Sequence, residues 1–134
     1  MYGILITLIG ITAGAVGFLV ATFWFQPILR YRDLKAQILS DLIFFANVIK
    51  TDGLNPEMKE RGWRRVEANR RHSADLAAAF HYLPRLYLWL LRRKSECPDK
   101  ASVEMMSFSN TFEWTEAEKR VNSIRRFLRF PPEE

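Results

Sequence analysis

The sequence predicts an all-α protein with one N-terminal transmembrane helix that continues, kinked near Pro27, into a small cytoplasmic helical bundle. Two observations predict this fold. Residues 1–29 carry no charged side chain, whereas all 20 basic and 15 acidic residues follow them. Beyond residue 29 the apolar side chains recur at helical spacing, without strand alternation or an internal repeat. This composition excludes a simple soluble globule, a disordered tail protein and a multi-span channel or carrier.

Residues 4–25 are the expected membrane anchor. They are rich in Ile, Leu, Val and Phe, and as a helix they would reach ~33 Å, which is enough to cross a bilayer. A cleaved secretory signal would need a basic segment before the apolar run and small residues at its exit, where Phe23, Trp24 and Phe25 stand instead. A buried core helix would need a larger soluble domain to cover it. We therefore expect an uncleaved anchor over residues 1–26.

The basic residues beside the anchor predict its orientation. Arg30, Arg32 and Lys35 follow the apolar run closely, and no basic side chain precedes it. Because basic flanks stay on the cytoplasmic side, we expect a bacterial inner-membrane protein with its N-terminus outside. Residues 27–130 would then form the cytoplasmic helical domain and residues 131–134 an acidic tail.

Small residues follow one side of the anchor with alternating spacings of four and three. This small-residue face consists of Gly3, Thr7, Gly10, Gly14, Gly17 and Ala21. Small side chains let two helix backbones approach closely in lipid, so the face is a candidate homo-oligomer interface. The alternative is an accident of composition, because glycine is common in membrane helices.

The same spacing continues beyond the anchor, and we call these later positions the cytoplasmic seam. It consists of Trp24, Ile28, Tyr31, Lys35, Ile38, Leu42, Phe45 and Ile49. One interpretation is a parallel homo-oligomer whose copies contact each other along the first 50 residues. The other is that this half packs on later helices of the same chain, because further apolar residues widen the stripe. Pro27 predicts a kink or break between the two halves.

Helix signals divide the remaining chain. A first helix over residues 27–50 would stop at Thr51–Asp52–Gly53. The second would start at Asn55 and Pro56 and run to about Tyr82. Residues 83–91 are apolar almost all round with arginines on both sides, so they form either a segment on the membrane surface or a core helix.

Two further helices complete the predicted bundle. One would span residues 100–112, with a core of Val103, Met106 and Phe108. The last would begin with a capping box of Thr115 and Glu118 and stop at Pro131–Pro132. Its expected core positions are Ala117, Val121, Ile124 and Leu128.

Residues suited to catalysis are few. A lone Cys97 excludes an internal disulfide and a Cys-cluster metal site, and it fits a reducing compartment. His72 and His81 would lie on opposite sides of one helix and would not share a metal. The common zinc, hydrolase and nucleotide motifs are absent from the sequence. We therefore expect no metal, no cofactor and no conventional enzyme activity.

One pattern still resembles a catalytic motif. Arg65 and His72 are seven residues apart, a spacing similar to the R-x(4–6)-H of HEPN-type helical ribonucleases. The resemblance implies that Arg65 and His72 would act on a scissile phosphate at a dimer interface. This sequence departs from the family pattern because Val66 stands where the family usually has a polar residue.

Arginines on the second cytoplasmic helix form a candidate surface for anions or a partner. By their spacing Arg61, Arg64, Arg65 and Arg71 fall on one face. Anionic lipid, an acidic protein or nucleic acid would suit such a face. Aromatic residues do not alternate regularly with these arginines for base stacking, since Trp63 alone stands among them, so nucleic acid is not an expected partner. The alternative is a solvated face with interspersed acids.

The stretch at residues 41–49, Asp-Leu-Ile-Phe-Phe-Ala-Asn-Val-Ile, follows the span and a basic segment. In this context the chain resembles small bacterial membrane proteins with one anchor, a short helical domain and no known activity. Three hypotheses follow. The first is a non-enzymatic single-pass protein whose bundle self-associates and binds a cytoplasmic protein partner. The second is a membrane-perturbing oligomeric effector of a phage-defence or toxin system, and the third is a HEPN-like ribonuclease.

Overall fold

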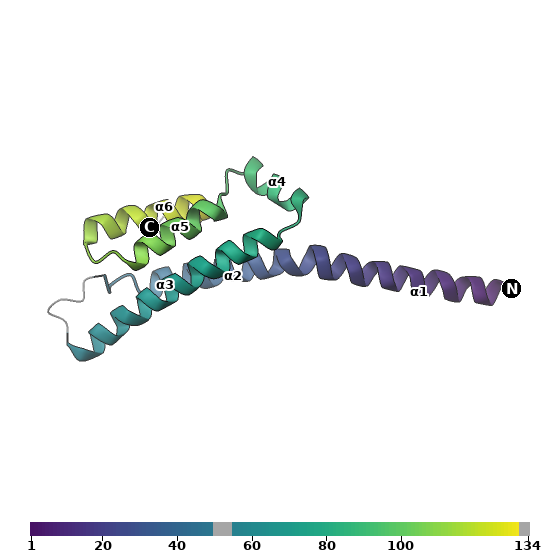
Figure 1. Ribbon diagram of the computed structural model, residues 1–134, viewed down its shortest axis with the longest axis horizontal. Coiled ribbons are helices and arrows are strands. Elements are labelled where there is room, and N and C mark those ends of the chain that lie inside the picture. Colours follow the sequence, from purple (N-terminus) through teal and green to yellow (C-terminus); the bar gives the residue numbers. More distant parts are fainter. Residues whose placement is uncertain (50–54, 132–134) are drawn as a thin grey trace.

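In the computed structural model, residues 1–49 and 55–131 are described, and within them every regular element is helical. The predicted all-α class is confirmed. A long N-terminal helix extends far beyond a small bundle (Figure 1). The elements are α1 (Tyr2–Val20), η1 (Ala21–Phe25), α2 (Gln26–Phe44), α3 (Pro56–Tyr82), α4 (Arg85–Arg93), α5 (Pro98–Ser109) and α6 (Trp114–Leu128).

The first three elements form one continuous helix, Tyr2–Phe44. Its five residues before Gln26 are π-helical, with the Gln26 amide donating to the carbonyl of Ala21, five residues back. Pro27 explains this widened turn, because proline lacks an N–H and its ring would crowd the carbonyl four residues earlier. The helix bends gently near this point and does not break (Figure 1). The predicted irregularity at Pro27 thus takes the form of a π turn.

The boundaries of the next helices follow local capping chemistry. α2 ends at Phe44, earlier than the predicted residue 50, and the predicted stop at residues 51–53 lies outside the described residues. The predicted start of α3 is confirmed, since the Asn55 side chain accepts a hydrogen bond from the Met58 amide at 2.8 Å. Leu83, in extended conformation before Pro84, ends α3.

The bundle is built around α5, which packs against both α3 and α6, while α2 packs against α3 (Figure 1). One apolar core joins these helices. Its fully buried side chains include Tyr31, Ile38, Leu76, Ala101, Met105, Ala117, Ile124 and Leu128.

The predicted core of α5 was partly wrong. Val103 is 65% exposed and Met106 is 42% exposed, whereas Ala101, Met105 and Phe108 face the core. The helix begins at Pro98 and not at residue 100, and α3 and α6 lie on two sides of it. The inward positions therefore follow the helices on either side, which the apolar residues of α5 alone do not reveal.

Both ends of α6 also differ from the prediction. The helix starts after Glu113, and no side chain caps it, so the Thr115–Glu118 capping box is wrong. Its other end is closed before the prolines, because Arg129 adopts φ 54° and the Phe130 amide donates to the Arg125 carbonyl at 2.8 Å. The predicted core positions of α6 are confirmed, with Val121 partly buried. In the predicted acidic tail, residues 132–134 lie outside the described residues.

Candidate functional site

The surface of α1 is the first candidate site. Every residue of this helix is exposed, including large apolar side chains such as Ile4, Ile11 and Phe18. Among the described residues, Tyr2–Phe44 is the one helix long and apolar enough to cross a membrane by length and composition. Water is a poor solvent for an isolated apolar helix of this kind, so the surface needs lipid or protein around it.

The small-residue face of this helix is open. A Cβ atom added at Gly3, Gly10, Gly14 or Gly17 would meet nothing within 4 Å. Thr7 stays close to the backbone, because its hydroxyl donates to the Gly3 carbonyl at 2.9 Å. None of the residues that the structure describes occupies the space at these glycines, and the role of the face as an oligomer interface stays a prediction.

The cytoplasmic seam is different, because from Tyr31 onward most of it packs inside the chain. Tyr31 and Ile38 are fully buried, and Leu42 and Phe45 are less than one tenth exposed. Of the two interpretations of this half, packing on later helices of the same chain is the one that the structure shows. An oligomer interface along all of the first 50 residues would require these side chains to leave the core of their own chain.

A buried carboxylate ties the start of α2 to the connector between α4 and α5. The Tyr31 hydroxyl and the Lys35 ammonium group both donate to Oε1 of Glu96, the second over 2.7 Å. The Glu96 side chain is 7% exposed. Burial, followed by the neighbouring Glu96 carboxylate, raises the pKa of Tyr31, which keeps the phenol protonated as a donor.

Backbone geometry at the end of α4 holds this carboxylate in place. Ser95 adopts φ 58°, and the Glu96 amide donates to the Leu91 carbonyl at 2.9 Å. These features form a Schellman motif that turns the chain inward. The Cys97 amide then donates to the Phe127 carbonyl at 2.9 Å, which joins the connector to α6. This site could not be predicted from the sequence, because a serine replaces the usual glycine and the partners are far apart along the chain.

Arg65, one of the two residues of the ribonuclease-like pattern, is fully buried. Its guanidinium group donates to the carbonyls of Phe108 at 3.3 Å and Thr111 at 3.0 Å. The group also lies over the rings of Phe108 and Phe112. Burial lowers the pKa of Arg65, but a guanidinium remains charged at neutral pH. Arg65 thus neutralises the carbonyl end of α5.

His72, the second residue of that pattern, is buried two turns further along α3. Its Nε2 atom lies 2.6 Å from Oδ2 of Asp41, so the imidazole links α3 to α2. Arg65 and His72 therefore both bind groups of their own chain. This arrangement supports a structural role for the pair and leaves Arg65 no exposed surface for a phosphate. His81, in contrast, is exposed.

The predicted arginine face is divided by the packing. Arg61 donates to the Phe44 carbonyl at 2.9 Å and lies over the Phe44 ring, so it caps the end of α2. Arg65 turns into the core, as described above. Arg64 and Arg71 are exposed and line a cavity of about 330 Å³ whose wall also contains Asp41 and Glu67. Two of the four arginines, Arg64 and Arg71, are therefore exposed at the surface, and acidic residues lie beside them.

Two further cavities lie at opposite ends of α2. One, of about 320 Å³, lies where the apolar helix meets α3, and we call it the junction cavity. It is lined by Thr22, Phe23, Gln26, Pro27, Arg30, Ala79 and Tyr82. The other, of about 330 Å³, lies between the end of α2, α5 and α6, and we call it the distal cavity. It is lined by Leu42, Ala46, Ile49, Phe108, Trp114, Thr115, Glu118, Val121 and Asn122.

Comparison with known proteins finds no matching family model, no matching curated protein and no matching solved structure. The resemblance to small bacterial proteins with one anchor stays a prediction.

The Glu96 site predicts a pH-dependent contribution to stability. Tyr31→Phe removes a hydrogen bond to a buried carboxylate and should lower the free energy of unfolding by about 1.5–3 kcal/mol at pH 8. The folded-state pKa of Tyr31 lies above its ordinary value of 10.0. The contribution is therefore complete below pH 10 and is lost as the pH rises toward the folded-state pKa.

Denaturant unfolding of the full chain in detergent micelles, followed by near-ultraviolet circular dichroism, measures this difference at each pH. Tyr82→Phe is the matched control, because Tyr82 is 73% exposed. The control should differ little from the wild type. An equal effect of both variants, or a Tyr31→Phe effect that grows above pH 10, would contradict the role assigned to Glu96.

The position of Arg65 predicts a large structural effect of its removal. Arg65→Met keeps most of the side-chain volume but removes the two hydrogen bonds that the guanidinium donates to the carbonyls of Phe108 and Thr111. The Phe108 carbonyl still accepts from the Thr111 amide, so the expected loss is about 1.5–3 kcal/mol, the contribution of a hydrogen bond that involves a charged group. Arg64→Met is the control, because that side chain is 70% exposed.

The same denaturant unfolding measures both variants, and an RNA cleavage assay accompanies it. We expect Arg65→Met to be clearly destabilised and Arg64→Met to resemble the wild type. A stable Arg65→Met variant that has lost an RNA cleavage activity of the wild type would support the ribonuclease hypothesis instead.

Proposed function

We propose that this chain is a non-enzymatic, single-pass inner-membrane protein with its N-terminus outside and its helical bundle in the cytoplasm. In this proposal α1 and η1 cross the bilayer and self-associate through the small-residue face. The bundle presents its far end to a protein partner. No cofactor takes part.

The observation that carries the proposal is the change of environment along one continuous helix. Over residues 2–20 every side chain is exposed, and none is charged. After Pro27 the same helix carries Arg30 and Arg32 on its exposed side and buries Tyr31, Leu34 and Ile38. Such a helix suits lipid in its first half and water with a protein core in its second half.

The geometry favours a non-enzymatic role. The groups that the sequence offered for catalysis, Arg65 and His72, are buried and bound to Phe108, Thr111 and Asp41. They hold α5 and α2 against α3. Both side chains thus already make polar contacts that stabilise the fold.

The small-residue face supports self-association inside the membrane. It is open on α1, whereas the cytoplasmic seam from Tyr31 onward is mostly buried within the chain. Association between copies would therefore be confined to the span, and each copy would keep its own bundle. Close backbone contact across Gly10 and Gly14 would then supply the packing energy that hydrophobic burial does not provide between helices in lipid.

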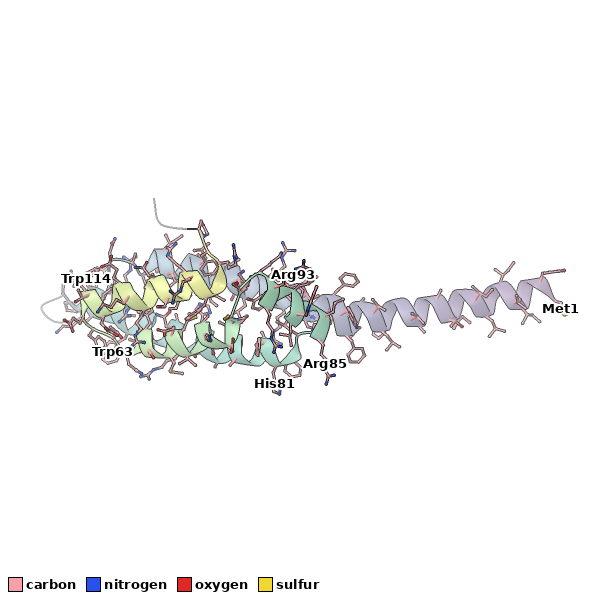
Figure 2. The ribbon with its side chains drawn as sticks, turned by 90° about the horizontal axis from the view of Figure 1, so that it is seen from above. Met1, Trp63, His81, Arg85, Arg93 and Trp114 are labelled. Carbon is pink, nitrogen blue, oxygen red and sulfur yellow. The ribbon has the colours of Figure 1, made fainter. Side chains whose placement is uncertain are left out.

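Exposed aromatic side chains support a partner site at the end of the bundle farthest from the membrane. Trp63 is 63% exposed and Trp114 is 52% exposed. Figure 2 shows both at the end of the molecule opposite Met1. Trp114 also lines the distal cavity. Exposed tryptophans beside a hollow are typical of protein interaction surfaces.

Charged residues inside the span should abolish membrane integration. Ile11→Arg with Ala15→Arg places two guanidinium groups near the centre of the span, at about 2.5–3.5 kcal/mol each. Ile43→Arg with Ala46→Arg is the matched control, because it puts the same two changes on exposed positions near the end of α2.

Extraction of cell membranes at alkaline pH, with the intact mass of the chain measured in parallel, tests this expectation. The wild type and the control should stay in the membrane pellet, while the first variant should be lost from it. A wild-type chain that is released at alkaline pH, or that begins near Gln26, would contradict the proposed anchor.

Bulk on the small-residue face should prevent self-association. Gly10→Ile with Gly14→Ile should abolish crosslinked oligomers in the membrane, because the added side chains keep the backbones apart. Ala15→Ile adds a branched side chain about 120° away around the helix, which makes it the control. Crosslinking in isolated membranes measures the oligomers. Oligomers that survive the glycine changes, or that disappear in the control, would show that this face is not the interface.

A further inference from the structure

The short helix α4 lies beside the point where the apolar helix enters the bundle (Figure 1). The ring of Tyr87 in α4 packs edge-on against Tyr31 in α2, with centroids 6.2 Å apart. Tyr31 follows Phe25, the last residue of the expected span, by six residues or ~9 Å of helix. The headgroup layer on each side of a bilayer is ~5–8 Å thick. The residues of α4 are thus close to the depth of the headgroups.

The chain just before α4 reaches the span itself. Tyr82, the last residue of α3, lines the junction cavity together with Thr22 and Phe23 from η1. Tyr82 is also 73% exposed. From there α4 runs obliquely to the long axis of the molecule, from Arg85 on one side of that axis to Arg93 on the other in the view of Figure 2. A helix placed this way is inclined toward the plane of a membrane that α1 crosses.

The two faces of α4 differ in their surroundings. Leu91 is buried, and Tyr87 and Leu88 pack against the core, so one face belongs to the bundle. The opposite face consists of Leu86, which is 54% exposed, Trp89, which is 52% exposed, and Leu90, which is 39% exposed. We call these three residues the outer face of α4. Within residues 1–49 and 55–131 these side chains stay exposed.

The charges around the outer face are all positive. Residues 85–95 contain four basic side chains and no acid, and these four are exposed: Arg85, Arg92, Arg93 and Lys94. The Arg93 guanidinium lies over the Trp89 ring, 5.4 Å from its centroid. An apolar strip with a tryptophan and a border of basic residues is typical of helices that lie on anionic lipid.

We propose that the outer face of α4 lies on the cytoplasmic surface of the bilayer, with Leu86, Trp89 and Leu90 at the acyl boundary and the arginines on anionic phospholipid headgroups. This proposal rests on the proposed function, because it needs the anchor in the same bilayer. Continuity with the span and the purely basic border favour lipid over a second copy of the chain. The contact fixes the tilt of the bundle and directs Trp63 and Trp114 away from the membrane.

Single-tryptophan variants of the full chain test the proposal. All four tryptophans are exposed, from 46% at Trp24 to 63% at Trp63, so replacement of any three by Phe leaves the core intact. Each variant is reconstituted in vesicles of phosphatidylglycerol and phosphatidylcholine brominated high on the acyl chains, which quench nearby tryptophan emission. We expect Trp89 to lose most of its emission, Trp114 to keep its emission, and Trp24 to be quenched as the marker of the anchor.

The role of the arginines is tested in the variant that retains only Trp89. Arg85→Gln, Arg92→Gln and Arg93→Gln together should reduce quenching in the anionic vesicles. Arg64→Gln, Arg70→Gln and Arg71→Gln change three exposed arginines of α3 and should leave it unchanged. Trp24, examined separately in both triple variants, should stay quenched. Equal quenching of Trp89 in phosphatidylcholine alone would overturn the recognition of anionic headgroups.

The outcomes separate the two proposals. Quenched Trp24 with unquenched Trp89 would overturn the contact of α4 while the anchor stands. Unquenched Trp24 would overturn the proposed function itself. Trp89 that is unquenched by lipid but becomes protected from aqueous acrylamide as the protein concentration rises would assign the outer face to a second copy, and it would overturn the lipid contact.

Discussion

In the proposed arrangement the structure depends on one constraint, which is that a single helix must satisfy two solvents. Its first 25 residues carry no charge and are almost entirely exposed. The proposal places their apolar side chains in lipid, where their backbone must be hydrogen-bonded within the helix. Its remaining residues bury one side against α3 and expose the other to water. The π turn before Pro27 lies where the two environments meet, and it keeps the helix continuous despite the proline.

Two buried charged groups then stabilise the bundle, and one of them ties it to this helix. Glu96 joins the connector after α4 to Tyr31 and Lys35, close to the proposed membrane surface. Arg65 joins α3 to the carbonyl end of α5 at the other end of the bundle. Each charge has hydrogen-bond partners, which offsets its burial. The tie at Glu96 also positions α4, so the placement of the outer face follows from the same contact that stabilises the core.

The parts of the fold that depend on local chemistry could be predicted from the sequence. The apolar run, the Asn55 cap and the irregularity at Pro27 each have a cause within a few residues. The contacts that depend on tertiary packing could not. The inward positions of α5 follow from the helices on either side of it, so Val103 was wrongly assigned to the core. The spacing of the arginines predicted one shared face of α3. It could not show that Arg61 and Arg65 would turn toward carbonyl groups of α2 and α5. Glu96 had no sequence signal, because a serine makes the left-handed turn that usually belongs to glycine.

Cysteine accessibility across the first helix tests the membrane-crossing claim most directly. Single cysteines at Tyr2, Ala15 and Ala36, in a Cys97→Ser background, are treated with a membrane-impermeant maleimide in intact spheroplasts and after lysis. A span with its N-terminus outside predicts that Tyr2→Cys reacts in intact spheroplasts, Ala36→Cys reacts only after lysis, and Ala15→Cys reacts in neither. Labelling of Ala15→Cys after lysis without detergent, or of Ala36→Cys in intact spheroplasts, would contradict the proposed arrangement of the chain in the membrane.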